Sequence, residues 1–164
     1  MNYFYAMLRT LSVAILCLCA LLARPVFAAG AVEMQVEHIL LQAVDEYNQT
    51  MEAGDSSPWM KYFTDNVFRH SPIGDQQGKK DFGEYVAWEY KNFQAKYVTK
   101  KIIVGGRSAA ILFIWDAIHK ASGTPLKIEM VGIYELASSG KFDSVSFYYD
   151  TAKAGKYFAD VAGK

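Results

Sequence analysis

His70 is the first candidate for acid–base chemistry, because histidine titrates near neutral pH and can take and return a proton without strong tuning. It lies in the segment Phe68-Arg69-His70-Ser71-Pro72, at the end of a short strand-like stretch. Two interpretations stay open for this side chain: it lines a pocket, or it hydrogen-bonds the carbonyls of the turn that follows. Asp75 can pair with it, although a solvated loop carboxylate is the simpler expectation.

A second pair of candidates, Asp116 and His119, lies near the end of a long apolar stretch. The two residues are three positions apart, so in a strand their side chains point to opposite faces of the sheet and only one can enter a pocket. A register slip of one residue would exchange them. At this point either residue remains a candidate for proton transfer.

Several other chemistries have no basis in the residues. Three histidines without Glu-x-x-His or His-x-His spacing make a weak metal site, and there is no phosphate-binding glycine loop or Gly-x-Ser-x-Gly motif. We therefore expect no cofactor and no metal. The 17 basic residues balance the 17 acidic ones, which argues against nucleic-acid binding.

The first 28 residues have the pattern of a secretory signal peptide. An apolar run from Leu11 to Ala23 follows Arg9, and Val26-Phe27-Ala28 supplies small or medium residues at a cleavage site after Ala28. An uncleaved anchor is the alternative. Cys17 and Cys19 both lie in this leader, so the mature protein has no thiol. We expect a periplasmic or secreted single domain over residues 29–164, with its core over 33–152 and no membrane contact after cleavage.

The periodicity of apolar residues changes along this domain from about four to two. Helices grouped before an antiparallel meander indicate an α+β fold, with helices covering one face of a curved sheet. The tail after Asp150 can add a terminal helix through Tyr157, Phe158 and Val161, with Asp150 as its cap. The predicted helices are Glu33–Ala53, Ser57–Phe63 and Lys79–Phe93, and the predicted strands are Asn66–His70, Tyr97–Val104, Ser108–His119, Leu126–Leu136 and Lys141–Asp150.

Several segments, taken in order, resemble a known superfamily. They are Tyr62-Phe63-Thr64-Asp65-Asn66, Gly123-Thr124-Pro125, Gly132-Ile133-Tyr134-Glu135-Leu136 and Phe147-Tyr148-Tyr149-Asp150. Over residues 33–152 the chain resembles the nuclear-transport-factor-2-like superfamily, especially its SnoaL-like and ketosteroid-isomerase-like branch. The resemblance implies a cone-shaped α+β fold with a pocket at one end and a homodimer through the outer sheet face. It implies no single activity.

Ketosteroid isomerases use a tyrosine and a protonated aspartic acid as oxyanion donors and an aspartate as base. By this resemblance Tyr47 takes the tyrosine position, His70 the base position and Gly132 the position of the second donor. A glycine side chain donates nothing, and losing one oxyanion donor costs roughly 3–4 kcal/mol. We therefore do not expect a standard ketosteroid isomerase. Tyr47 can also be a packing residue with a satisfied hydroxyl.

The resemblance also places residues around the pocket and favours Trp115 and His119 inside, with Asp116 on the dimer face. An aromatic lining suits a small, mostly apolar ligand, and binding without firm catalysis is the first functional expectation. The alternative is a cofactor-independent isomerase, cyclase, dehydratase or hydrolase that uses His70 with Tyr47. The expected ligand-binding residues are Trp59, Tyr85, Trp88, Trp115, Met130, Gly132, Tyr134, Val145, Phe147 and Tyr149.

Overall fold

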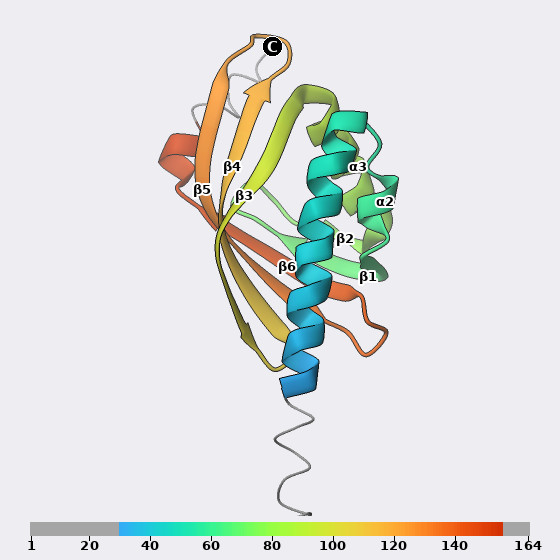
Figure 1. The fold of residues 1–164 in the computed structure, drawn as a ribbon. Coiled ribbons are helices and arrows are strands. Elements are labelled where there is room, and N and C mark those ends of the chain that lie inside the picture. The colour runs from blue at the N-terminus through green and yellow to red at the C-terminus, as the bar shows by residue number, and fades with distance from the viewer. Residues whose placement is uncertain (1–29, 156–164) are drawn as a thin grey trace, which may run out of the picture.

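A curved, six-stranded sheet carries the helices of residues 30–92 against one of its faces (Figure 1). The computed structural model describes residues 30–155. The strand order is β2 (Gln76–Gln77), β1 (Phe63–His70), β6 (Phe142–Tyr149), β5 (Pro125–Leu136), β4 (Ser108–His119) and β3 (Phe93–Gly105). Strand β1 runs parallel to β6, and the other neighbours are antiparallel. This is the α+β architecture that the sequence predicts. The predicted leader and the predicted helix through Tyr157 lie outside the described residues.

The N-terminal helix covers residues 30–53 and buries the predicted apolar stripe. Val36, Leu40, Tyr47 and Met51 are all fully buried. Gly54 ends this helix with a φ of 74°, a conformation that glycine adopts without steric cost. The short helix α2 (Ser57–Met60) comes next in the sequence, and a turn of two residues, Lys61 and Tyr62, connects it to β1.

Three predicted boundaries are wrong because strand pairing with distant segments extends the strands. The helix expected to reach Phe63 ends at Met60, and the strand expected from Asn66 begins at Phe63, since Phe63 pairs with Phe142 in the parallel β1–β6 contact. The strand expected from Tyr97 begins at Phe93, because β3 (Phe93–Gly105) pairs with β4 (Ser108–His119) along its whole length. It therefore follows α3 (Gly78–Asn92) without a linker.

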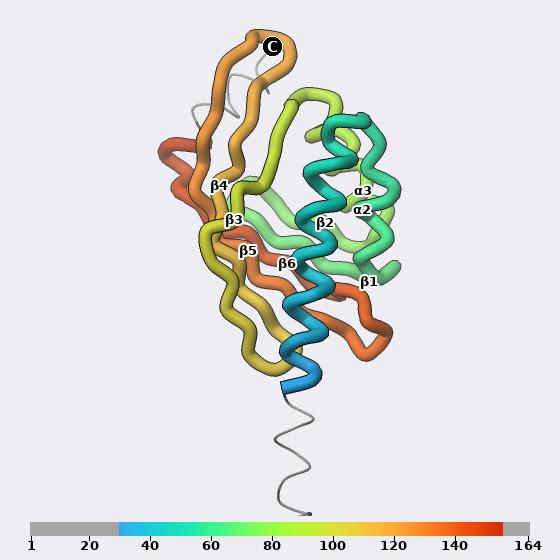
Figure 2. Tube along the Cα trace, in the orientation of Figure 1, coloured from blue at the N-terminus to red at the C-terminus, as the bar shows by residue number. Residues whose placement is uncertain are grey.

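The predicted four-strand meander is confirmed as β3, β4, β5 (Pro125–Leu136) and β6. Register shifts between Thr99 and Lys101 in β3 and between Glu135 and Leu136 in β5 are irregularities of the kind that bend a sheet. Figure 2 shows the trace of the meander curving beside the N-terminal helix. The structure adds one element that the sequence does not predict, the two-residue strand β2 (Gln76–Gln77), which pairs with β1.

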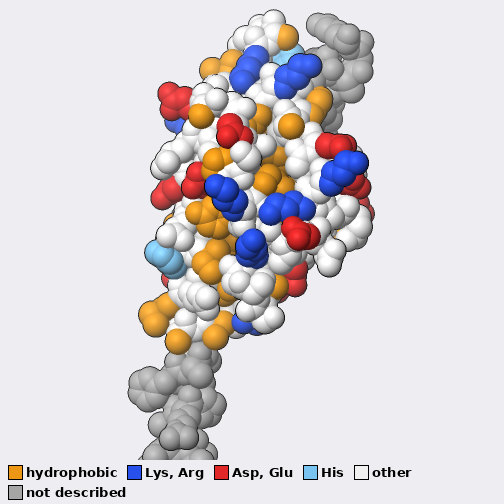
Figure 3. All heavy atoms as spheres, turned by 90° about the vertical axis from the view of Figure 1, so that its right-hand side faces the viewer, with side chains coloured by type: hydrophobic (Ala, Val, Ile, Leu, Met, Phe, Trp, Pro, Cys, Tyr) orange, Lys and Arg blue, Asp and Glu red, His pale blue; other side chains and the backbone are white. Residues whose placement is uncertain are grey.

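The C-terminal end of the described chain is helical and capped. Asp150 caps the helical residues 151–155, since its Oδ1 accepts from the backbone N–H of Ala152 at 2.9 Å. Within residues 30–155, no helix combines the length and apolarity that a membrane crossing requires. Figure 3 shows basic and acidic side chains interspersed on the side of the molecule where α2 and α3 lie.

Candidate functional site

A small cavity lies between the helices and the inner face of the sheet. Its volume is about 30 Å³, which is room for one or two water molecules. The walls are mostly aromatic, and two side chains that can carry charge, Arg69 and Glu89, reach it. Ten of the described residues line it: Trp59, Arg69, Phe82, Tyr85, Glu89, Tyr97, Trp115, Met130, Phe147 and Tyr149.

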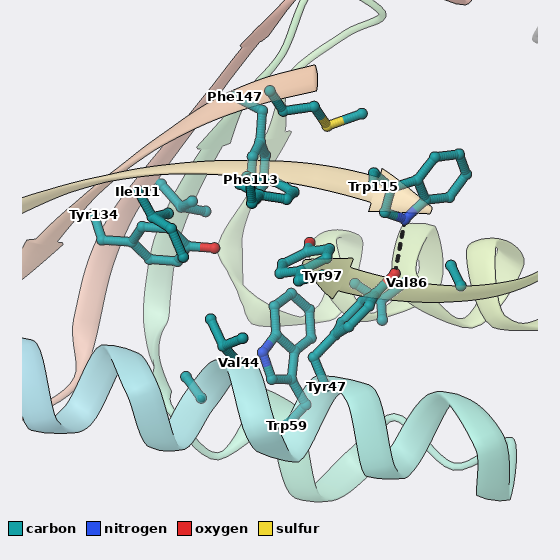
Figure 4. Packing of buried hydrophobic residues seen from close by; sticks show 14 of the residues in the cluster. Val44, Tyr47, Trp59, Val86, Tyr97, Ile111, Phe113, Trp115, Tyr134 and Phe147 are labelled. Carbon is teal, nitrogen blue, oxygen red and sulfur yellow. Dashed lines mark hydrogen bonds between the residues drawn. The ribbon is translucent and has the colours of Figure 1, made fainter. Parts of the chain in front are cut away.

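Glu89 is held at the cavity by two hydrogen-bond donors from other elements. The Tyr47 hydroxyl, on the N-terminal helix, donates to Glu89 Oε1. Trp115 Nε1, on β4, lies 3.2 Å from the same carboxylate oxygen and 3.0 Å from the Tyr47 hydroxyl. Figure 4 shows Tyr47 and Trp115 pointing toward each other, with the dashed line marking their contact. The three side chains form one connected polar cluster inside an aromatic core.

The sequence places Glu89 inside because it lies on the buried face of α3. Phe82 and Val86 precede it at helical spacing, and all three are buried. Burial raises the pKa of the Glu89 carboxyl, although the hydrogen bond from Tyr47, the charge of Arg69 and the hydrogen bond from Trp115 oppose the shift. Burial, together with the neighbouring Glu89, also raises the pKa of Tyr47. Glu89 is thus a carboxyl biased toward its protonated form, and Tyr47 remains a hydrogen-bond donor.

Arg69 reaches the cavity from β1, where alternation turns Val67 and Arg69 inward. Its Nη1 donates to Gln76 Oε1 at 2.5 Å and to Ser71 Oγ at 3.0 Å. Its guanidinium carbon lies 3.9 Å from the centroid of the Tyr85 ring, within the range of a cation–π contact. These contacts fix the guanidinium group against the aromatic wall.

The structure places some of the predicted ligand-binding residues at the cavity and others away from it. Trp59, Tyr85, Trp115, Met130, Phe147 and Tyr149 line the cavity. Tyr134 and Val145 are instead buried in the core, and Gly132 is packed so closely that a Cβ there would lie 3.0 Å from the Tyr134 ring. Trp88 is 37% exposed because it lies next to Glu89 on the helix, about a quarter turn away from the buried face.

His70 and Tyr47 do not face a common pocket. Since Arg69 points inward, the next residue along β1 points outward, and His70 belongs to the outer side of the sheet. Its Nδ1 lies 2.6 Å from Asp75 Oδ1, and the two side chains are 40% and 52% exposed. His70 therefore pairs with Asp75, as the sequence allows, but it does not line the cavity. Tyr47 is fully buried behind Glu89 rather than in the lining.

The structure places the candidate residues of β4 on two different faces of the sheet. Trp115 and His119 share the inner face, and Asp116 lies on the outer face, where its carboxylate is 3.1 Å from Lys127 Nζ. His119 does not reach the cavity: its Nδ1 is 2.9 Å from Ser122 Oγ, and its ring packs against Phe93. Neither of the two proton-transfer candidates on this strand contacts the cavity.

Sequence reasoning did not single out Arg69 and Glu89 as cavity-lining residues. The signal was present in both cases, since each is a charged residue at a position where the periodicity calls for a buried one. Such a residue is rarely buried without a partner or a function. In the described part of the chain, no three His, Cys, Asp or Glu side chains gather in a way that can hold a metal ion.

The comparisons with known proteins agree with this fold. Residues 44–145 match the SnoaL-like domain family, and the chain belongs to that family. No curated protein matches the chain.

Solved structures similar to this chain include three with different printed names. A putative SnoaL-like polyketide cyclase from Jannaschia sp. CCS1 has a TM-score of 0.66 and 15% identity over 76% of this chain and 91% of its own. A putative isomerase from Rhodopseudomonas palustris has a TM-score of 0.66 and 16% identity over 77% and 98%. The epoxide hydrolase/cyclase-like enzyme SalBIII has a TM-score of 0.61 and 22% identity over 73% and 96%. At these identities the likeness establishes the fold alone.

Proposed function

We propose that this SnoaL-like domain is exported and binds a small, mostly apolar ligand in the aromatic cavity. The observation that carries the proposal is the composition of that cavity: rings and Met130 form the walls, and Arg69 and Glu89 supply the polar groups. Few, fixed polar groups in an apolar surround are typical of small-molecule sites. The hydrogen bonds of Glu89 and the stacking of Arg69 on Tyr85 orient these groups before a ligand arrives.

The cavity volume limits the size of the ligand. About 30 Å³ is well below the roughly 150 Å³ of an engineered apolar cavity that holds benzene. A ligand as large as benzene must therefore displace side chains that line the cavity. Tyr85 and Tyr149 are half-buried, and Met130 is an unbranched side chain that adapts its shape easily. The ligand therefore enters beside these residues.

A cavity-filling variant tests the binding proposal. Met130→Trp places a large ring in the cavity, whereas Glu84→Trp places the same ring on the exposed side of α3 and serves as the control. We expect small aromatic compounds to raise the melting temperature of the wild-type protein and of Glu84→Trp, but not of Met130→Trp. Equal shifts in all three proteins would place binding elsewhere.

A second function, cofactor-independent proton transfer, is favoured by the presence of Glu89 in the lining. In its ionised form, a buried carboxylate with a raised pKa is a stronger base than an exposed one; it can accept a proton from a carbon next to a carbonyl group and, as the resulting acid, return that proton to another carbon of the same molecule. No proton is gained or lost overall. Here Glu89 is the acid–base group, and Tyr47 and Trp115 position it. Names such as isomerase and polyketide cyclase among similar folds are compatible with this chemistry.

Glu89→Gln tests the second function because it keeps the shape and the acceptor oxygen but removes the acid–base group. We expect turnover of any accepted substrate to fall at least 100-fold, which is the usual scale of acid–base catalysis. The control is Glu84→Gln, an exposed position on the same helix. Full turnover by Glu89→Gln together with loss in His70→Ala would move the chemistry to the outer His70–Asp75 pair.

A further inference from the structure

Arg69 is a buried cation without an ion-pair partner. Its side chain is only 4% exposed. The ion pairs of residues 30–155 are those of His70 with Asp75 and Lys127 with Asp116, so no described carboxylate lies within 4 Å of Arg69. An arginine stays charged at every physiological pH, and a buried charge is normally paired. Something outside the described groups can therefore still neutralise it.

The guanidinium group also retains an unused donor. Its Nη1 contacts Ser71, Gly74 and Gln76, all through neutral oxygens. Arg69 Nε, in contrast, is buried and has no hydrogen-bond partner among the described residues. A buried donor left unpaired is costly, so its persistence needs a reason. The residue lines the cavity, where a ligand atom can reach it.

Glu89, which lines the cavity with a carboxyl group, does not pair with Arg69. It forms no ion pair with Arg69, and its Oε1 already accepts from Tyr47 and Trp115. Burial also biases its carboxyl toward the neutral form. Among the described residues, the Arg69 guanidinium group beside the apolar rings therefore has no carboxylate in contact with it.

We propose that Arg69 binds the carboxylate group of a small organic acid, whose apolar part packs against the aromatic walls beside Tyr85. This inference rests on the proposed ligand-binding function of the cavity and specifies its ligand class. A carboxylate both neutralises the guanidinium charge and accepts the hydrogen bond of Nε, which a neutral amide or a hydrocarbon cannot do equally well. The stacking on Tyr85 keeps the guanidinium plane ready for it.

Two pairs of probes test the proposal in the whole domain: benzoate against benzamide, and acetate against acetamide. Members of a pair have nearly the same shape and differ in charge. We expect each carboxylate to bind at least tenfold more tightly than its amide by NMR titration. The Nε–H signal of Arg69, assigned by its loss in Arg69→Lys, shifts with the carboxylates and not with the amides.

Arg69→Gln provides the second arm, with Arg107→Lys as an exposed control. The Gln variant removes the charge, and we expect benzoate affinity to fall at least tenfold while benzamide affinity changes less. If Arg69→Gln does not fold, the comparison of carboxylates with amides in the wild-type protein still tests the proposal. Equal binding of benzoate and benzamide, without a shift of the Nε–H signal, overturns the inference but leaves the ligand-binding function intact. Absence of binding by every probe and every apolar compound overturns the function itself.

Discussion

At the scale of single residues, the polar cluster of Tyr47, Glu89 and Trp115 makes stability depend on pH. Burial raises the pKa of Glu89 in the folded protein above its value of about 4.3 in an unfolded chain. As pH rises past that lower value, the unfolded chain loses its proton first. The stability that the protonated carboxyl contributes is complete below about pH 4.3 and is lost as pH rises through the folded pKa.

Replacing Glu89 with glutamine removes this pH dependence. We measure the free energy of unfolding with urea between pH 4 and 8. As pH rises, we expect the value for Glu89→Gln to increase relative to the value for the wild-type protein. Glu84→Gln, on the exposed side of the same helix, should follow the wild-type curve. Parallel curves for Glu89→Gln and the wild-type protein would show that Glu89 titrates normally.

Tyr47 supports the same carboxyl by hydrogen bonding, so its hydroxyl can be tested separately. Tyr47→Phe keeps the ring, which stacks on Tyr97 at 4.0 Å between centroids, but removes the donor to Glu89. We expect a loss of about 1–3 kcal/mol in the free energy of unfolding and a further rise in the pKa of Glu89, visible in its side-chain NMR signal. The exposed Tyr148→Phe is the control, and an unchanged Glu89 signal in Tyr47→Phe would contradict the role of the hydroxyl.

How far the site could be predicted from the sequence differs from residue to residue. The alternation in β4 correctly separates Trp115 from Asp116, because it depends only on neighbouring residues. The meeting of Glu89 and Arg69 at one cavity depends on how α3 packs against β1, which no local pattern contains. His70 was misplaced relative to the cavity because a one-residue difference in strand register reverses the face to which a side chain points.

At the scale of elements, close packing on the inner face of β5 explains why Gly132 has no side chain. A Cβ at this position would lie 3.0 Å from Tyr134, 3.2 Å from Phe147 and 3.3 Å from Ile111, all side-chain atoms. We expect Gly132→Ala to lower the free energy of unfolding by about 1–3 kcal/mol, because buried rings must shift. Gly105→Ala, with open space around its Cβ, should cost less in the same denaturation experiment. Equal losses of stability in Gly132→Ala and Gly105→Ala would mean that the rings of Tyr134 and Phe147 move aside without cost.

Most helices and strands could be predicted, because a long stretch in which apolar residues recur at a regular period fits only one type of secondary structure. The stripe of the N-terminal helix and the alternation of β4 and β5 are confirmed almost to the residue. The errors fall where pairing with distant segments decides: the start of β1, the start of β3 and the two residues of β2. Sheet curvature likewise arises from register shifts between strands, which the sequence does not reveal.

At the scale of the whole molecule, the outer face of the sheet carries exposed apolar side chains that fit the proposed homodimer. Ile118, Ile133 and Tyr148 are 49%, 36% and 48% exposed on adjacent strands. We propose that a second copy covers them, and we expect light scattering to give twice the mass of one chain. Ile133→Glu should yield a monomer, whereas Leu41→Glu, on the N-terminal helix, should not. A monomeric wild-type protein would contradict the proposal.

Export is the other proposal at this scale, and it depends on residues 1–28. The apolar run from Leu11 to Ala23 is shorter than a membrane span needs, and Ala28 closes a pattern that a signal peptidase can cleave. When the full chain is expressed in a bacterium, we expect the protein in the periplasmic fraction to begin at Ala29, as read by intact-mass spectrometry. Ala28→Arg, which places a large charged side chain at the cleavage position, should retain the leader. A periplasmic or membrane-bound product that keeps all 28 residues would instead support an uncleaved anchor, and a full-length cytoplasmic product would contradict export.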